Sequence, residues 1–345
     1  MNYSSILRFS TFHIYLIAVF IIGAEIFIVM FNYISLSLPT IRQWRHLVSD
    51  ISCHYSEYGD ALPSAEDVSF SPKSNSIYFH ETSCRGGLTS RQACSIEAAA
   101  RTHPKREVYV LFSAPVSENV LKRSCLAKLL QFDNIKAARV HIDMYAKGST
   151  IEPILLDLDE SNYPIQHTSD ILRILTLNKW GGIYLDTDMI VVKSLDELPP
   201  NWVAKQSDFS LASGILSFAK DEVGRNVTKR ILELLSQNFD PYDWIANGPY
   251  IVQNAVLPLC MTGNISENCN GIKIMPYELF YPLHYSLWKF FFRVETFSTT
   301  ESPYSYHMWN YLSSAEKIEK GSLYQVLAKK YCPSIYELYG EDFGM

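Results

Sequence analysis

Short apolar runs alternate with helical stripes along most of this chain. Ile77–Phe79, Val108–Ser113 and Ala138–Ile142 are apolar runs of strand length. Glu118–Leu130, between them, has the spacing of a helix. Helices that alternate with short apolar strands are typical of a parallel sheet covered on both faces. The pattern therefore predicts an α/β fold, with a mainly parallel sheet flanked by helices.

Polar side chains and glycines mark where the predicted helices begin and end. Thr89, followed three residues later by Gln92, is a capping-box pair and predicts a helix start. Ser169 is the expected cap of a second helix, which is apolar nearly all round and therefore buried. Gly181-Gly182 ends that helix, because glycine tolerates the left-handed backbone common at helix C-termini.

An apolar stretch near the N-terminus, Ile14–Phe31, is interrupted only by Gly23 and Glu25. As a helix it would be roughly 27 Å long, about the hydrocarbon thickness of a bilayer. It is either an uncleaved membrane anchor or a signal peptide cleaved before Leu38. We expect the anchor, because the run exceeds the usual apolar core of a signal peptide, about 7–15 residues. The expected organisation is a cytosolic tail (1–12), a transmembrane signal-anchor (13–34), a stem (35–72) and a lumenal domain (73–345).

Composition excludes some classes of protein. The chain has 345 residues, a net charge of −6 and 48% hydrophobic residues, which is too apolar for a disordered protein. Its acidic balance argues against a nucleic-acid partner, which would require a basic face. All 7 cysteines follow the apolar stretch, and Asn226 and Asn264 begin glycosylation sequons. These features predict that the body of the chain lies in an oxidising, lumenal compartment.

The cysteines predict one disulfide and leave the others open. Cys260 and Cys269 bracket a short Gly/Asn/Ser segment, which predicts a disulfide-closed loop. Two more bridges would use Cys84, Cys94, Cys125 and Cys332, in a connectivity that the sequence does not reveal. Cys53, in the expected stem, is then left over and available to bridge two chains in a homodimer.

Two Asp-x-Asp tripeptides occur, and their surroundings separate them. Asp157-Leu158-Asp159 runs into polar residues and a proline, which predicts a solvated loop. Asp186 and Asp188 follow the apolar run Ile183–Leu185, at the carboxyl end of a buried strand where α/β sheets bind ligands. In an extended chain, residues two apart point the same way. Two converging carboxylates favour a divalent cation, Mn²⁺ or Mg²⁺, that also takes phosphate oxygens.

The segments around this tripeptide resemble a known family. The core of the resemblance is His167-Thr168-Ser169-Asp170-Ile171-Leu172-Arg173 followed by Lys179-Trp180-Gly181-Gly182-Ile183-Tyr184-Leu185-Asp186-Thr187-Asp188. Further matches, in order, are Tyr78–Ser83, Cys94–Pro104, Asn247-Gly248-Pro249, Phe280-Tyr281-Pro282 and His307-Met308-Trp309-Asn310. Together they resemble the DXD-containing α1,4-galactosyltransferases and α1,4-N-acetylglucosaminyltransferases, and most closely the insect-type members.

The resemblance implies a GT-A-like fold, a single-pass type II Golgi membrane protein with a lumenal catalytic domain, a UDP-sugar donor and Mn²⁺. It also implies retention of the anomeric configuration. The expected reaction moves galactose or N-acetylgalactosamine in α1,4 linkage onto a glycosphingolipid-type acceptor. The alternatives are an α1,4-N-acetylglucosaminyltransferase acting on glycoprotein glycans, or a non-catalytic sugar-binding relative. Asn247 stands where the vertebrate members are expected to carry Gln, which leaves the donor sugar open.

Several residues take expected roles from the resemblance. His307 is the expected third metal ligand, because related folds complete the metal shell with a late histidine. Asp170 and Arg173, one helical turn apart, either form a buried ion pair or bind the donor's sugar and phosphate. Glu81 and Tyr184, at strand ends, are expected near the uridine.

The acceptor side is less defined by the sequence. Asp243 and Asn247 flank a Gly-Pro turn and are candidates for contact with the acceptor or the reacting carbon, or else serve the turn itself. The aromatic residues of Tyr277–Phe292 and Tyr304–Tyr311 either fill the core or stack on sugars. A metal-dependent phosphatase of the Asp-x-Asp type is the competing class, although Ile190 stands where such enzymes carry Thr or Val.

Overall fold

The computed structural model of the chain describes residues 51–56, 58–260, 268–295 and 302–345. The predicted tail, the predicted anchor at 13–34 and the Asn264 sequon lie outside these residues. No helix in the described part of the chain combines the length and the apolar character needed to cross a bilayer.

The centre of the fold is a mixed sheet with the strand order β3-β2-β1-β4-β7-β6-β9-β8. Its strands are β1 (Ile77–Glu81), β2 (Val108–Phe112), β3 (Ile135–Arg139), β4 (Gly182–Leu185), β6 (Trp202–Ser207), β7 (Ser210–Phe218), β8 (Asn268–Cys269) and β9 (Ile272–Met275). β1 to β4 are mutually parallel and β6 is parallel to β9, whereas β7 runs against both its neighbours. The predicted α/β class with a mostly parallel sheet is confirmed. A second, two-stranded sheet pairs β5 (Met189–Val191) with β10 (Ser305–His307).

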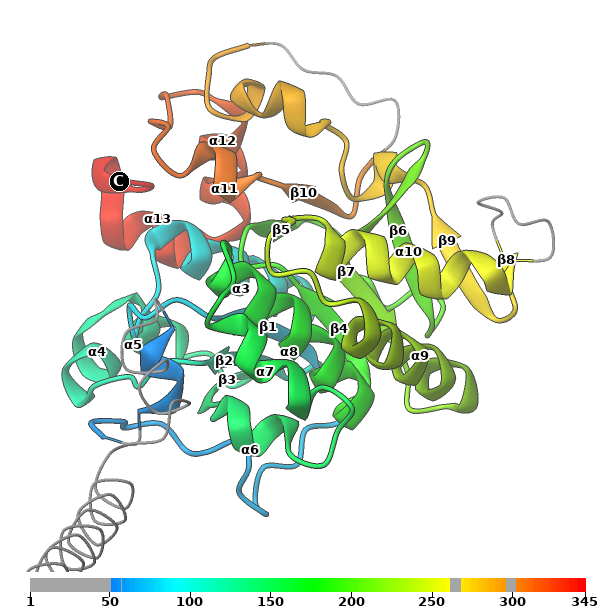
Figure 1. Cartoon of the computed structure of the whole chain (residues 1–345). Helices are drawn as coiled ribbons and strands as arrows, with labels where there is room; N and C mark the ends of the chain where they lie inside the picture. The colour runs from blue at the N-terminus through cyan, green and yellow to red at the C-terminus, as the bar shows by residue number, and fades with distance from the viewer. Residues whose placement is uncertain (1–50, 57, 261–267, 296–301) are drawn as a thin grey trace, which may run out of the picture. The chain divides into compact units, whose positions relative to one another are not determined.

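Helices cover both faces of the sheet (Figure 1). One face is covered by α3 (Ser90–Thr102), α5 (Cys125–Leu129), α12 (Leu323–Tyr331) and α13 (Pro333–Tyr339). The other is covered by α6 (Ile142–Ala146), α7 (Leu155–Leu158), α8 (Pro164–Trp180), α9 (Glu222–Asn238) and α10 (Ile251–Val256). Short α4 (Glu118–Arg123) and α11 (Asn310–Ser313) lie in connections. Because both faces are covered, β1 is buried along its whole length: Ile77 and Phe79 face one core and Tyr78 faces the other.

The turn from α8 into β4 sets the position of the tripeptide Asp186-Thr187-Asp188. α8 ends at Gly181, which has φ 68°, and Gly182 follows with φ 108°. A side chain at Gly182 would collide with the carbonyl of Ser76, so only glycine permits this turn beside β1. The predicted helix stop at Gly181-Gly182 is confirmed. Asp186 and Asp188 therefore emerge where β4 leaves the sheet.

Some predicted boundaries were wrong. The Thr89–Gln92 capping box is present, but the helix expected to start at Ser169 begins earlier, at Pro164. Proline suits the first helical position because its missing N–H needs no partner there. The helix predicted over Glu118–Leu130 is broken, because Ser124 caps a new helix.

Two other local predictions also needed correction. The strand predicted at Ala138–Ile142 lies earlier, as β3, because it pairs with β2 in a register that matches Ile135 to Val108. The loop predicted around Asp157 contains the short helix α7, on which Asp157 is exposed.

The disulfides partly match expectation. The predicted Cys260–Cys269 bridge is present. Cys53, predicted to be the unpaired residue, bonds to Cys84, and Cys94 bonds to Cys332. The free thiol is Cys125, which is buried in α5 and donates to the carbonyl of Leu88 at 3.4 Å. Cys53 is therefore not available to join two chains.

The segment that precedes β1 is fixed to the edge of the sheet by Arg139. Ser64 forms a β-bridge with Arg139, and the N–H of Ala65 donates to the Arg139 carbonyl at 2.7 Å. The buried guanidinium forms an ion pair with Asp60 at 3.1 Å. It also donates to the carbonyls of Cys53, His54, Ser56, Phe112 and Val140. Residues 51–56 and 58–66, from the region expected to be a stem, thus lie against the sheet.

Candidate metal centre and donor site

Asp186 and Asp188 lie in a tight turn between β4 and β5. The N–H of Asp186 donates to the carbonyl of Gly214 in β7 at 2.8 Å, and the N–H of Met189 closes the turn on the Asp186 carbonyl at 3.0 Å. A side chain at Gly214 would collide with Oδ2 of Asp186. A glycine in β7 therefore leaves room for the carboxylate at this point.

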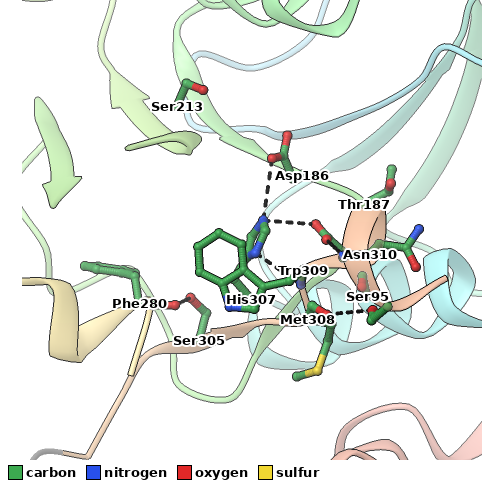
Figure 2. Close-up of polar contacts among 12 residues, drawn as sticks. Ser95, Asp186, Thr187, Ser213, Phe280, Ser305, His307, Met308, Trp309 and Asn310 are labelled. Atoms are coloured by element: carbon green, nitrogen blue, oxygen red, sulfur yellow. Dashed lines mark hydrogen bonds and ion pairs between the residues drawn. The ribbon is translucent and has the colours of Figure 1, made fainter. Parts of the chain in front are cut away.

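The small sheet brings His307 to the two aspartates. β10 pairs with β5 so that His307 lies opposite Met189. Its Nε2 is 3.8 Å from Oδ2 of Asp186 (Figure 2). The same nitrogen is 3.3 Å from Oδ1 of Asp188. One ligand atom from each of the three side chains lies within 4.8 Å of the others. The three residues predicted as metal ligands are thus brought together.

The protonation of these groups reflects their close packing. Burial raises the pKa of Asp186, but Arg173 and His307 outweigh it, so that this pKa lies below its usual range. Burial and the neighbouring Asp186 carboxylate raise the pKa of Asp188. Burial lowers the pKa of His307, but Asp188 and Asp186 outweigh it, and the net shift is upward. Protons and a divalent cation would therefore compete for these groups.

Arg173 joins the predicted donor residues to the acidic turn. Its guanidinium contacts Asp170 at 2.9 Å and Asp186 at 3.3 Å, and it donates to Oγ of Ser213 at 2.7 Å. The ion-pair interpretation of Asp170 and Arg173 is confirmed, and the pair also reaches the metal-binding residues. A side chain at Gly248 would collide with Oδ1 of Asp170, so a second glycine brings backbone close to a carboxylate. The predicted role of the pair in donor binding stays a prediction.

Tyr184 and Glu81 differ in the hydrogen bonds that their side-chain oxygens make. The Tyr184 hydroxyl donates to Oδ1 of Asp186 at 2.6 Å and contacts Oγ of Ser169 at 2.9 Å. Tyr184 therefore orients Asp186. Glu81 is buried at the end of β1, where Oε1 accepts from the Ser83 hydroxyl at 2.6 Å. Its Oε2 is buried without a close hydrogen-bond partner.

The two acceptor-side candidates lie in the loop before α10. Asn247 is buried, and its side chain closes the loop by pairing with the backbone N–H and carbonyl of Asp240. Its amide is therefore engaged with the backbone of its own loop, and its predicted contact with the acceptor stays a prediction. Asp243 is exposed, and one carboxylate oxygen accepts from the N–H of Ile245 at 3.0 Å.

Three residues at the site were not assigned roles from the sequence. The N–H of Asn310 donates to Oδ2 of Asp188 at 2.7 Å. The Trp309 ring packs edge-on against His307, with centroids 4.3 Å apart. The buried Tyr281 hydroxyl has no partner and adjoins the position that a Gly214 side chain would take, beside Asp186. All three occur in segments that carry the family resemblance, which was the available signal.

The structure describes the sequon at Asn226, whereas the sequon at Asn264 lies outside the described residues. Asn226 is exposed in α9, whereas Thr228 is buried and its hydroxyl donates to the Gly224 carbonyl at 2.8 Å. Because that hydroxyl is occupied in the folded helix, glycosylation of Asn226 would have to precede folding. Glycosylation at either sequon stays a prediction.

Comparisons with known proteins agree with this site. Residues 89–206 match the model of the glycosyltransferase sugar-binding region containing the DXD motif, and residues 220–339 match that of the α1,4-glycosyltransferase conserved region. Lactosylceramide 4-α-galactosyltransferase of Gorilla gorilla gorilla is 31% identical over 292 residues, which cover 78% of this chain and 85% of that protein. The chain belongs to the α1,4-glycosyltransferase family.

Two further comparisons are with more distant proteins. Human α-1,4-N-acetylglucosaminyltransferase is 24% identical, over 75% of this chain and 79% of that protein. A solved galactosyltransferase, in complex with donor and acceptor sugar analogues, is 14% identical with a TM-score of 0.43. That comparison covers 76% of this chain and 95% of the solved one.

Proposed function

We propose that this chain is a retaining transferase that moves galactose or N-acetylgalactosamine from a UDP-sugar, in α1,4 linkage, onto a glycosphingolipid-type acceptor. The observation that carries the proposal is the cluster of Asp186, Asp188 and His307 beside Arg173, where β4 leaves the sheet. Family membership supports glycosyl transfer, and the name of the 31% identical relative supports galactose and a glycolipid.

The ligand set fits a hard divalent cation. Two carboxylates and one imidazole suit Mn²⁺ or Mg²⁺ with a nucleotide diphosphate. Such an ion supplies Lewis-acid compensation for the charge that develops on the leaving UDP. The chain's own residues prepare the site: Tyr184 orients Asp186, and Arg173 adds a fixed positive charge at 3.3 Å from that carboxylate.

The nucleotide's base is assigned to the end of β1. The partnerless Oε2 of Glu81 is a suitable acceptor for the imide N–H of uracil. Gln92, whose amide lies 3.5 Å from Oγ1 of Thr187, connects this strand end to the acidic turn. We therefore place the uridine between β1 and α3, and the diphosphate over Asp186 and Asp188.

The carboxylates of the cluster are all held by other groups. Asp186 is held by Tyr184 and Arg173, Asp170 by Arg173, and Asp188 by the N–H of Asn310. Each of these carboxylates is thus already engaged in a contact that holds the site together. This supports attack on the same face of the donor sugar, in which the acceptor hydroxyl loses its proton to the departing phosphate.

We also propose a type II Golgi membrane protein with its catalytic domain in the lumen, attached through the predicted anchor at 13–34. The bridges Cys53–Cys84, Cys94–Cys332 and Cys260–Cys269 support an oxidising compartment. The net charge of −6 gives no reason to expect a nucleic-acid partner.

The test is a transfer assay on the full-length chain in detergent, with UDP-galactose, UDP-N-acetylgalactosamine, UDP-N-acetylglucosamine and UDP-glucose. Each donor is offered with lactosylceramide, with and without Mn²⁺, and the product linkage is read by NMR. The expected product is an α1,4-linked galactoside or N-acetylgalactosaminide, formed only with Mn²⁺. Exclusive use of UDP-N-acetylglucosamine would assign the alternative transferase activity. Neither transfer nor hydrolysis with any donor would contradict the proposal and favour a non-catalytic sugar-binding protein.

A further inference from the structure

Two aromatic rings from separate segments meet beside the metal-binding cluster. The rings of Trp244 and Tyr311 have centroids 3.9 Å apart and planes tilted by 37°. Tyr163, at the start of α8, packs edge-on against Trp244 at 5.1 Å. We call these three residues the aromatic platform. The platform thus joins three segments that are far apart in the sequence: the start of α8, the loop before α10, and α11.

Both segments that carry the ring pair are fixed to carboxylates of the site. Tyr311 follows Asn310, whose N–H donates to Asp188 at 2.7 Å. Trp244 precedes the π-helical turn η3 (Ala246–Tyr250), in which Gly248 abuts Asp170. Since Arg173 links Asp170 to Asp186, both segments contact one connected group of charged side chains. The ring pair therefore joins two segments that each adjoin a carboxylate of the site.

The platform is open where a substrate would approach. Tyr311 is 61% exposed, and Trp244 is half-buried and backs it. Asp243, the neighbour of Trp244, is an exposed carboxylate. An exposed aromatic ring with an adjacent carboxylate can hold a sugar by stacking on its C–H face and accepting from its hydroxyls. We propose that Tyr311, supported by Trp244, stacks on the terminal sugar ring of the acceptor, and that Asp243 accepts a hydrogen bond from one of its hydroxyls.

The stereochemistry of a β-galactoside fits this surface and deepens the proposed function, on which the inference rests. The 4-hydroxyl of galactose is axial, and the opposite face of the ring carries the axial C–H groups. When that apolar face stacks on Tyr311, the 4-hydroxyl points away from the platform, free to attack the donor. In a β-glucoside the 4-hydroxyl is equatorial and lies near the plane of the ring. The platform therefore selects β-galactosides over β-glucosides.

The experiment measures binding and turnover separately on the full-length chain. Tyr311→Ala and Trp244→Ala are compared with Tyr311→Phe, which keeps the ring, and with the matched control Tyr242→Ala. Tyr242 is 62% exposed in the same loop as Trp244. Soluble octyl β-lactoside replaces the lipid acceptor, so that loss of membrane contact cannot mimic loss of stacking. Hydrolysis of the UDP-sugar without acceptor reports on the donor and metal site.

We expect the acceptor KM to rise about tenfold or more in both alanine variants, with donor hydrolysis unchanged. Tyr311→Phe and Tyr242→Ala should behave like the wild type, and the preference for β-galactosides over β-glucosides should fall in Tyr311→Ala. An unchanged acceptor KM in both alanine variants would overturn the inference. An equal fall in donor hydrolysis would also overturn it, because the rings would then only support the metal site.

A direct binding measurement keeps the inference separate from the proposed function. Methyl β-lactoside is titrated against tryptophan fluorescence in the presence of UDP and Mn²⁺, in the wild type and in Trp244→Phe. A saturable change that is reduced in Trp244→Phe supports the platform, even if no donor is ever transferred. No change in the wild type at millimolar lactoside would count against the platform, whether or not transfer occurs.

Discussion

Two buried arginines, Arg139 and Arg173, lie in contrasting surroundings. Arg139 forms an ion pair with one carboxylate, Asp60, and its hydrogen-bond partners are backbone carbonyls of neighbouring segments. Arg173 faces two carboxylates, Asp170 and Asp186, and a third, Asp188, lies beyond them. In the first cluster the charges balance. In the second, three carboxyl groups share two basic groups, Arg173 and His307.

The difference shows which buried charge indicates function. A buried arginine that is saturated by carbonyls and one carboxylate holds segments together and has nothing left to bind. A buried excess of carboxylates is unfavourable on its own, and a ligand of positive charge relieves it. The surplus acidic group, rather than the arginine, therefore marks the site. The two clusters should respond to mutation in opposite ways.

The largest expected effect is on turnover at the acidic cluster. Asp188→Asn keeps the shape of the side chain but removes one metal-binding charge, so transfer should fall by at least about a hundredfold. Thermal unfolding should change little. The matched control is Asp157→Asn, in the second Asp-x-Asp tripeptide, where the aspartate is exposed on α7. Near-normal transfer by Asp188→Asn would remove the metal assignment.

The next effect is on stability at the balanced cluster. Arg139→Leu leaves Asp60 and several carbonyls buried without their partner, and the free energy of unfolding should fall by about 3–5 kcal/mol. Urea denaturation measures this, and transfer per folded molecule should be kept. Arg106→Leu is the control: its partner Asp196 has a half-exposed side chain, so the loss should be about 1 kcal/mol or less. Wild-type stability in Arg139→Leu would contradict the structural role of the Arg139 cluster.

The smallest effect is a pH dependence confined to the acidic cluster. Because the pKa values of His307 and Asp188 are raised, their protons must leave when Mn²⁺ binds, so Mn²⁺ affinity should rise with pH. The contribution of protonated His307 to the metal-free protein is present below its ordinary pKa and is lost as pH rises through the raised value.

Differential scanning fluorimetry checks this directly. The increase in Tm on adding Mn²⁺ should be larger at pH 8 than at pH 6, and His307→Gln should weaken the dependence. A Tm increase that is the same at both pH values would contradict the proposed proton displacement.

The acidic turn was predictable from sequence because its causes are local. An apolar helix, two glycines and a short apolar run place Asp186 and Asp188 at a strand end without reference to distant residues. Side chains two residues apart in an extended chain share a side, so Tyr184 lies on the side of Asp186 and contacts it. The predicted position of Tyr184 near the uridine stays a prediction. His307 was found only through the family resemblance, since its position depends on the pairing of β10 with β5.

Tertiary structure decided what the sequence left open. Cys53 was expected to be free because its segment has no regular pattern, but Arg139 holds that segment against the sheet, where it meets Cys84. Asn247 was assigned to the acceptor side from its place in a Gly-Pro turn, yet its amide is used to close the loop with Asp240. The order of polar and apolar residues along the chain does not predict such pairings.

The bridge between Cys94 and Cys332 has a consequence for biosynthesis. It ties α3 to the residue just before α13, a sequence separation of 238 residues, and so encloses β4, β5 and β10 in one covalent ring. A ribosome delivers the first of these thiols long before the second. The ring is therefore closed only after Cys332 has been made, and a truncated product that ends before Cys332 would leave it open.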